Sequence, residues 1–200
     1  MASPQTIQPS TIDTYLRSAA PDSAYGSSQA LNVSPLDTDL KHLLVSFDFS
    51  ASVPSGVTIT LATLSLYANT VTAGRTIGCS RLRRTDWVET EANWNLYKAA
   101  TNWGTAGALN TSTDHDTTDG ADSASLSEAG WQAWTVTAQA QYARDTVAGI
   151  AHFFLRDTGA TATAPQAYRS REYTVITANC PKLYIEYTVP STFIPKCVFF

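Results

Sequence analysis

Residues 42–49 read HLLVSFDF, and this stretch alternates in the way that a half-buried β-strand requires. Every odd position from Leu43 to Phe49 is apolar, whereas the even positions end in Ser46 and Asp48. Because successive side chains of a strand point to opposite faces of its sheet, the stretch predicts one buried face and one wet face.

Similar short stretches continue on both sides of it, separated by turn residues. Strands are expected at residues 12–17, 30–33, 57–68, 77–82, 131–135, 149–155, 167–170 and 182–187. The alternation of 57–68 changes phase near Ala62 and Thr63, which predicts a bulge or a strand that passes between two sheets. One short helix is expected near residues 137–145, and residues 95–130 are expected to form a long loop. The sequence therefore predicts an all-β fold, a two-sheet antiparallel β-sandwich of jelly-roll type.

The composition fits one domain that has neither a membrane span nor a nucleic-acid partner. The chain has 200 residues, which suits a single sandwich over residues 1–189 and an apolar C-terminal extension at 190–200. Its formal net charge is −4, whereas domains that bind nucleic acid show a basic excess. No run of about 18 apolar residues occurs, so no membrane-spanning helix is expected. The first fifteen residues have neither a charged nor an apolar signal region, so no signal peptide is expected in this chain.

The three cysteines do not form a recognisable disulfide framework. Cys79, Cys180 and Cys197 are odd in number and widely spaced, which predicts free thiols. A bridge between Cys79 and Cys180 stays open as an alternative, since it depends only on the two Cα atoms lying within about 7 Å.

No motif for nucleophilic, metal-dependent or phosphate chemistry occurs, so the chain is not expected to be an enzyme. His152 lies within an apolar strand and is expected to be a satisfied core residue, whereas His42 is expected to be exposed. Glu89 and Glu91 flank Thr90, but no spacing rule selects a catalytic carboxylate pair. The alternative enzyme is a polysaccharide lyase that would use the neighbouring side chains Tyr168, Arg169 and Arg171.

The acidic stretch from Asp114 to Asp122 is the one candidate metal site that the sequence suggests. Asp114, Asp116 and Asp119 could supply the carboxylate oxygens that Ca²⁺ prefers. The alternative is a solvated acidic loop, because the spacing departs from the EF-hand pattern. No other cofactor is expected.

The chain contains 5 tryptophans, and aromatic faces can stack on sugar rings. The candidate glycan-binding residues are Trp103, Trp87, Trp94, Tyr168, Arg169 and Arg171. Trp103 lies beside Gly104 in the expected long loop and should be the most exposed of the tryptophans. The alternative is that the tryptophans are core anchors whose N–H groups are hydrogen-bonded.

Several segments, taken in order, resemble those of DNRLRE domains over about residues 11–188. They include Asp13-x-Tyr15, Ala24-Tyr25-Gly26, Trp87-Val88-Glu89, Ser170-Arg171-Glu172 and the strand 181–187. The resemblance implies a jelly-roll sandwich that is attached to secreted polysaccharide-active enzymes or found in surface and phage structural proteins. Some relatives act as carbohydrate-binding modules, and the resemblance supplies no catalytic residue.

The sequence is consistent with two functions. The first is a non-enzymatic structural or decorating subunit of a larger assembly, such as a phage head or tail. Its apolar extension would then contact other protein subunits through Phe193, Ile194, Val198, Phe199 and Phe200. The alternative is a carbohydrate-binding module of a secreted polysaccharide-active protein. Either function would place the chain on a virion or another extracellular surface, and virion surface proteins can also bind glycans.

Overall fold

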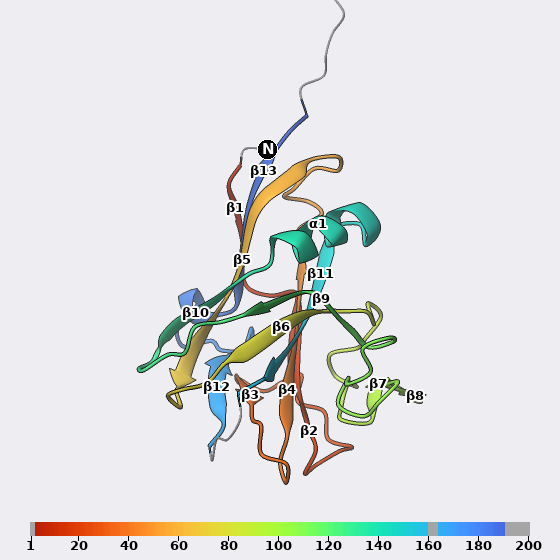
Figure 1. The fold of residues 1–200 in the computed structure, drawn as a ribbon, viewed down its shortest axis with the longest axis vertical. Coiled ribbons are helices and arrows are strands. Elements are labelled where there is room, and N and C mark those ends of the chain that lie inside the picture. The colour runs from red at the N-terminus through yellow and green to blue at the C-terminus, as the bar shows by residue number, and fades with distance from the viewer. Residues whose placement is uncertain (1–2, 160–163, 191–200) are drawn as a thin grey trace, which may run out of the picture.

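Two antiparallel sheets face each other in the computed structural model, which describes residues 3–159 and 164–190 (Figure 1). Sheet A contains β1 (Gln5–Ile7), β13 (Lys182–Thr188), β5 (Thr58–Thr70), β12 (Gln166–Arg169), β3 (Ala30–Val33) and β10 (Gly130–Thr135). Sheet B contains β2 (Ile12–Arg17), β4 (Lys41–Asp48), β11 (Ile150–Asp157), β6 (Ile77–Leu82) and β9 (His115–Asp122). The smaller elements are β7 (Leu96–Lys98), β8 (Thr101–Asn102), α1 (Thr137–Thr146) and η1 (Thr177–Asn179). The expected all-β sandwich with one short helix is confirmed.

The long strand β5 explains the phase change in the sequence. Opposite it, Glu186 pairs with Leu61 and Tyr187 pairs with Ile59, so Thr60 is an extra residue. This bulge lets Ile59 and the later residues Ala62 and Leu64 all face the core, although their spacing is not a strict alternation. The strand stays in sheet A, so the expected bulge is confirmed and a passage between sheets is not observed.

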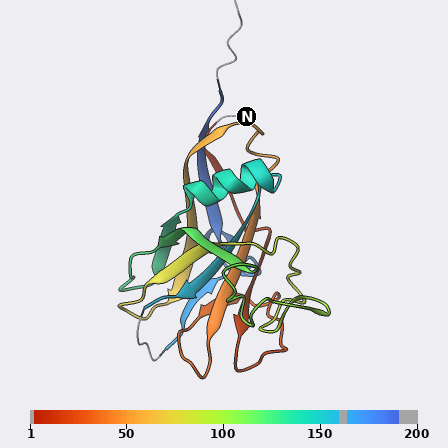
Figure 2. The ribbon, with the colours of Figure 1, turned by 45° about the vertical axis from the view of Figure 1, so that its right-hand side comes forward.

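The main core fills the space between the sheets. Trp134 is 1% exposed there, and its indole N–H donates to the carbonyl oxygen of Ile77 at 2.7 Å. Helix α1 contacts β5 from sheet A and β11 from sheet B, and it adds Ala140 and Ala143 to this core (Figure 2). The helix therefore packs against both sheets and contributes to the core between them.

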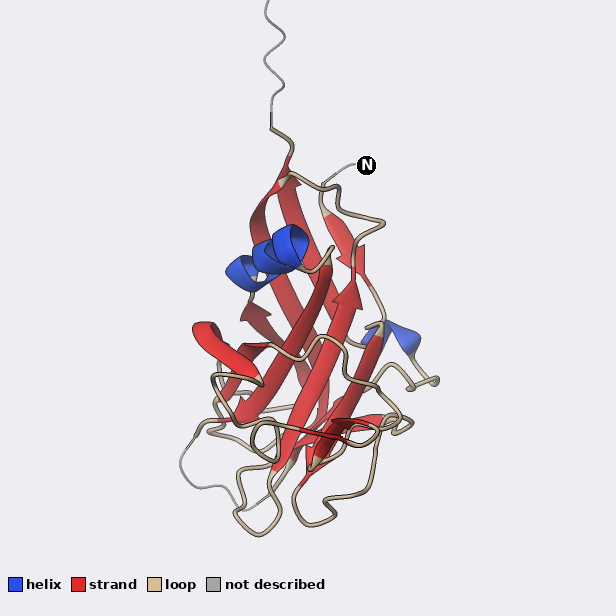
Figure 3. Ribbon diagram, turned by 90° about the vertical axis from the view of Figure 1, so that its right-hand side faces the viewer, coloured by secondary structure: helices blue, strands red, loops and turns tan. Residues whose placement is uncertain are grey.

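A second apolar cluster lies on the outer face of sheet B. It is covered by residues 83–114, which we call the covering segment; its loops lie in front of the strands in Figure 3. The sheet supplies Leu16, Leu44, Leu82 and Phe154, and the covering segment supplies Trp87, Ala92, Tyr97, Trp103 and Ala108. The expected loop at 95–130 is therefore wrong, because this region holds β7, β8 and the edge strand β9.

The two described ends of the chain lie together. Strand β1 pairs with β13, with Gln5 opposite Ile185, and the Tyr187 N–H donates to Ser3 Oγ at 2.9 Å. The predicted contact residues Phe193, Ile194, Val198, Phe199 and Phe200 lie outside the described residues, as does Cys197.

The described cysteines are free, since Cys79 lies in the main core and Cys180 follows η1, both buried as thiols. The Cys79–Cys180 bridge is therefore not formed. Within residues 3–159 and 164–190, no helix has the length and apolar character needed to cross a bilayer.

Candidate functional site

The tryptophans predicted to bind sugar belong to the second apolar cluster. Trp87 and Trp103 are each 4% exposed, and Trp94 is partly buried against the same cluster. The Trp103 indole N–H donates to the carbonyl oxygen of Asn93 at 2.9 Å. The expected exposure of Trp103 is wrong, because the covering segment folds back onto sheet B and encloses the ring. Buried rings offer no face to a sugar, so Trp87 and Trp103 act as core anchors.

His42, His115 and His152 all contact the second apolar cluster on the outer face of sheet B. His152 Nδ1 lies 2.5 Å from Ser46 Oγ and accepts a hydrogen bond from Trp87 Nε1 at 3.2 Å, which confirms a satisfied buried histidine. His42 is also buried, contrary to expectation, and its Nδ1 lies 2.8 Å from the Gly107 carbonyl oxygen. Burial lowers the pKa of both His42 and His152 to about 4.

Acidification is expected to destabilise the protein through His42. Because burial lowers the pKa of His42 from 6.5 to about 4, the unfolded chain binds the proton more tightly than the folded chain does. The stability due to the neutral ring is present above pH 6.5 and is lost as the pH falls toward 4, by at most about 1.4 kcal/mol per pH unit. Urea unfolding of the wild type and of His42→Gln between pH 7.5 and 4.5 tests this. The variant should lose less stability on acidification, and equal slopes would contradict the assignment.

Tyr168, Arg169 and Arg171 do not face a common groove. Tyr168 is fully buried, its hydroxyl donates to Gln132 Oε1 at 2.5 Å, and burial raises its pKa. The guanidinium carbon of Arg169 lies 3.9 Å from the ring centroid of Tyr173. The side chains predicted for a lyase or a glycan site are therefore separated by the alternation of β12, which turns Tyr168 into the core.

The structure does not bring Asp114, Asp116 and Asp119 together as metal ligands. The buried Asp114 carboxylate accepts three backbone N–H groups at 2.8–3.1 Å, from Gly104, Thr105 and Asn110. Asp116 pairs with Arg81 and Arg83, and Asp119 is exposed. The first two carboxylates therefore hold the covering segment and β9 in place, and the predicted calcium ligands are not supported in this loop.

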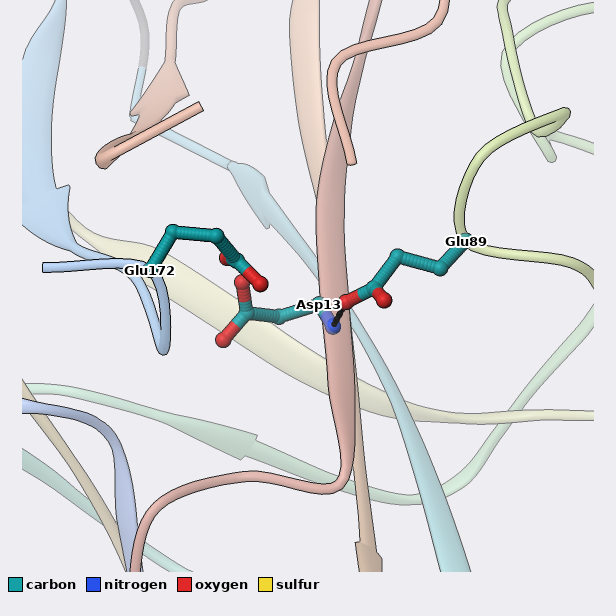
Figure 4. A group of neighbouring side chains, drawn as sticks. All are labelled: Asp13, Glu89 and Glu172. Atoms are coloured by element: carbon teal, nitrogen blue, oxygen red, sulfur yellow. Dashed lines mark hydrogen bonds between the residues drawn. The ribbon is translucent and has the colours of Figure 1, made fainter. Parts of the chain in front are cut away.

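Three other carboxylates meet at an edge of the sandwich (Figure 4). Asp13 comes from β2, Glu89 from the covering segment and Glu172 from the turn after β12. One oxygen of each lies within 4.8 Å of the others, and this is the only such group of acidic, histidine or cysteine side chains within the described chain. We call it the carboxylate triad.

Asp13 is buried, Glu89 and Glu172 are partly buried, and their negative charge is only partly compensated. Asp13 is 1% exposed; its Oδ2 accepts from Ser10 Oγ at 2.5 Å and from the Arg171 N–H at 3.0 Å, whereas Oδ1 has no hydrogen-bond partner. Burial raises the pKa of Asp13 to about 7, and burial followed by repulsion from Glu89 raises the pKa of Glu172. Ionisation of all three carboxylates is therefore unfavourable unless a further cation binds beside them.

The segments behind the family resemblance converge at the triad. Asp13, Glu89 and Glu172 each belong to one of those segments, and the Asp13 N–H donates to Glu89 Oε1 at 2.7 Å. Gly26 belongs to a fourth, and a Cβ there would lie 2.2 Å from the Glu89 carbonyl oxygen. Only glycine allows this approach. The order of these segments was visible in the sequence, but their meeting point depends on contacts across 76 residues or more.

The outer face of sheet A carries a second candidate site that sequence analysis missed. Trp131 lies opposite Tyr67 across β10 and β5, and their ring centroids are 5.5 Å apart in an edge-to-face arrangement. Lys182 on β13 places Nζ 3.8 Å from the Trp131 ring centroid, and Tyr184 follows on the same face. All four side chains are half-buried. Trp134 points into the core three residues after Trp131, so strand alternation could have identified Trp131 as the outward-facing ring.

A shallow pocket of about 230 Å³ lies on the part of sheet B that the covering segment leaves open. Its polar lining includes Ser80, Thr117, Asp122, Arg156 and Thr158. Gly78 and Gly120 form part of its floor, where a Cβ at Gly78 would lie 2.9 Å from Thr158 Cγ2. The pocket offers hydroxyl groups and one exposed cation, but its lining contains no aromatic ring.

Comparison with known proteins gives one match. A search among curated proteins finds no similar sequence. The family profile described as carbohydrate-binding module family 96 matches residues 4–187, which supports the expected likeness to carbohydrate-binding modules but does not confirm the DNRLRE name. Because this match spans nearly the whole sandwich, the chain belongs to carbohydrate-binding module family 96.

Proposed function

We propose that this chain is a non-catalytic module that binds polysaccharide through the outer face of sheet A. The family match favours this function over decoration of a phage particle, for which the comparisons give no support. The observation that carries the proposal is the half-exposed pair Trp131 and Tyr67 with Lys182 beside it.

The chemistry of this face suits an extended sugar chain. Sugar rings present C–H groups that can stack on aromatic rings, and polar groups beside the rings can fix the hydroxyl groups. Lys182 and Tyr184 lie two residues apart on β13, on the same side of the strand, and the Tyr184 hydroxyl donates to Glu186 Oε1 at 2.6 Å. Strands β10, β5 and β13 thus present rings and hydrogen-bonding groups in neighbouring rows.

Replacing Trp131 with alanine is expected to weaken polysaccharide binding at least tenfold, which corresponds to ~1.4 kcal/mol. The loss follows from removal of the stacking surface, and the fold should persist because the ring is half-exposed. Affinity electrophoresis on a panel of soluble polysaccharides, followed by calorimetry on those that bind, measures the change.

Tyr142→Ala is the matched control. Tyr142 is another exposed ring under a cation, with the Arg81 guanidinium carbon 3.6 Å from its centroid, but it lies on α1. The Tyr142→Ala variant should bind polysaccharide with wild-type affinity. If Arg156→Ala weakens binding and Trp131→Ala does not, the pocket on sheet B is the site instead. If no polysaccharide binds the wild type, the proposed function is wrong.

We further propose that the module works at an extracellular surface, because polymeric glycans are met there. Association with other protein subunits, including those of a virion, would be compatible with the same binding face. A pull-down from particles or secreted fractions would detect such subunits.

A further inference from the structure

We propose that Asp13, Glu89 and Glu172 form a calcium site that ties β2, the covering segment and the turn after β12 together. This inference does not rest on polysaccharide binding.

The geometry of the triad fits a calcium ion. Ligands that lie 2.3–2.6 Å from one Ca²⁺ can be at most about 5 Å apart, and the three carboxylate oxygens lie within 4.8 Å of one another. The triad therefore needs little rearrangement to share an ion. Ca²⁺ accepts six to eight oxygens in flexible arrangements, whereas Mg²⁺ demands a tight octahedron, so calcium suits these side chains from three separate segments better.

Two unsatisfied oxygens mark where the ion would lie. Asp13 Oδ1 and Glu172 Oε2 are buried and have no hydrogen-bond partner. Figure 4 shows the Asp13 and Glu172 carboxylates turned toward each other from opposite sides of the site. Buried carboxylate oxygens without a donor are costly, and a cation between them removes that cost.

The charge balance also calls for a divalent ion. Arg171 is the basic partner of the triad, with its guanidinium nitrogens 3.3 Å from Glu89 Oε2 and from Glu172 Oε1. When all three carboxylates are ionised, they and the one guanidinium leave a charge of −2, which one Ca²⁺ neutralises. Arg171 forms no hydrogen bond with Asp13 Oδ1 or Glu172 Oε2, so these two oxygens remain available to an ion.

Calorimetric titration of the full chain with CaCl2, after treatment with EDTA and at pH 8, tests the proposal. The wild type should bind one Ca²⁺, and its unfolding midpoint should rise by about 5–10 °C at a hundredfold excess over Kd. Glu172→Gln and Glu89→Gln keep the side-chain shape and remove one charge each, and each should weaken Ca²⁺ binding at least tenfold.

Asp119→Asn removes an exposed acid from the loop that sequence analysis favoured, and it should bind Ca²⁺ as the wild type does. Two results would overturn the proposal. One is the absence of binding heat and of any midpoint shift in the wild type at 5 mM CaCl2. The other is full retention of the calcium response in Glu172→Gln and Glu89→Gln. If either variant fails to fold, terbium luminescence of the wild type with competition by Ca²⁺ replaces it, and a lack of competition counts against the site.

Discussion

Replacing Trp103 with alanine should lower the free energy of unfolding by about 3–5 kcal/mol and leave polysaccharide binding by the folded protein unchanged. The ring is 4% exposed in the second apolar cluster, where its centroid lies 5.4 Å from that of Tyr97. Truncation would leave a cavity under the covering segment and the Asn93 carbonyl oxygen without its indole donor. Urea unfolding followed by fluorescence measures the loss, and binding is measured well below the unfolding midpoint.

Trp131→Ala tests the converse expectation, for a tryptophan that lies on the surface of a sheet. Because Trp131 is half-exposed on a sheet surface, its loss should cost about 1 kcal/mol or less in stability while weakening binding. The two variants therefore separate structural from ligand-binding tryptophans. A Trp103→Ala protein with wild-type stability and impaired binding would show that the ring reaches ligand after all.

Replacing Arg75 with methionine should cost about 3–5 kcal/mol of stability. The Arg75 and Asp157 side chains are 2% and 0% exposed, and their charged atoms are 2.8 Å apart. Methionine resembles the aliphatic part of the arginine side chain but leaves the Asp157 carboxylate buried without its cation. Burial already raises the pKa of Asp157, so the unpaired acid should bind a proton at low pH. The deficit should therefore be larger at pH 8 than at pH 5.

Lys98→Met is the control for this second experiment. Lys98 pairs with Asp86 at 2.5 Å, but the two side chains are 36% and 56% exposed. An exposed pair is worth ~1 kcal/mol or less, so its loss should be small at either pH. If Arg75→Met lowers the free energy of unfolding no more than Lys98→Met does, the buried ion pair stabilises the fold no more than an exposed pair does.

The alternation of apolar and polar residues predicted most of the fold because it indicates which face of each strand is buried. The strands at 12–17, 30–33 and 77–82 were predicted with the bounds that the structure shows. Strand β9 was missed because its sequence, HDTTDGAD, alternates no apolar residues; it is an edge strand with a largely exposed surface. An edge strand needs less apolar patterning since it buries less surface.

The candidate sites were harder to predict, for a different physical reason. Burial of Trp103 depends on how the covering segment folds over sheet B, and no local pattern encodes that tertiary contact. The same holds for the triad, whose members become neighbours only after two sheets and two loops have packed. Trp131 differs, because its outward orientation follows from its own strand once Trp134 is assigned to the core.

The pairing of β1 with β13 has a consequence for architecture. Residues 3 and 188 lie at the same tip of the sandwich, so a neighbouring domain joined at either side would connect through that single pole (Figure 1). The module would then be attached to its host protein at one end only. The outer faces of both sheets, including the surface with Tyr67 and Trp131, would then remain accessible to a polymer.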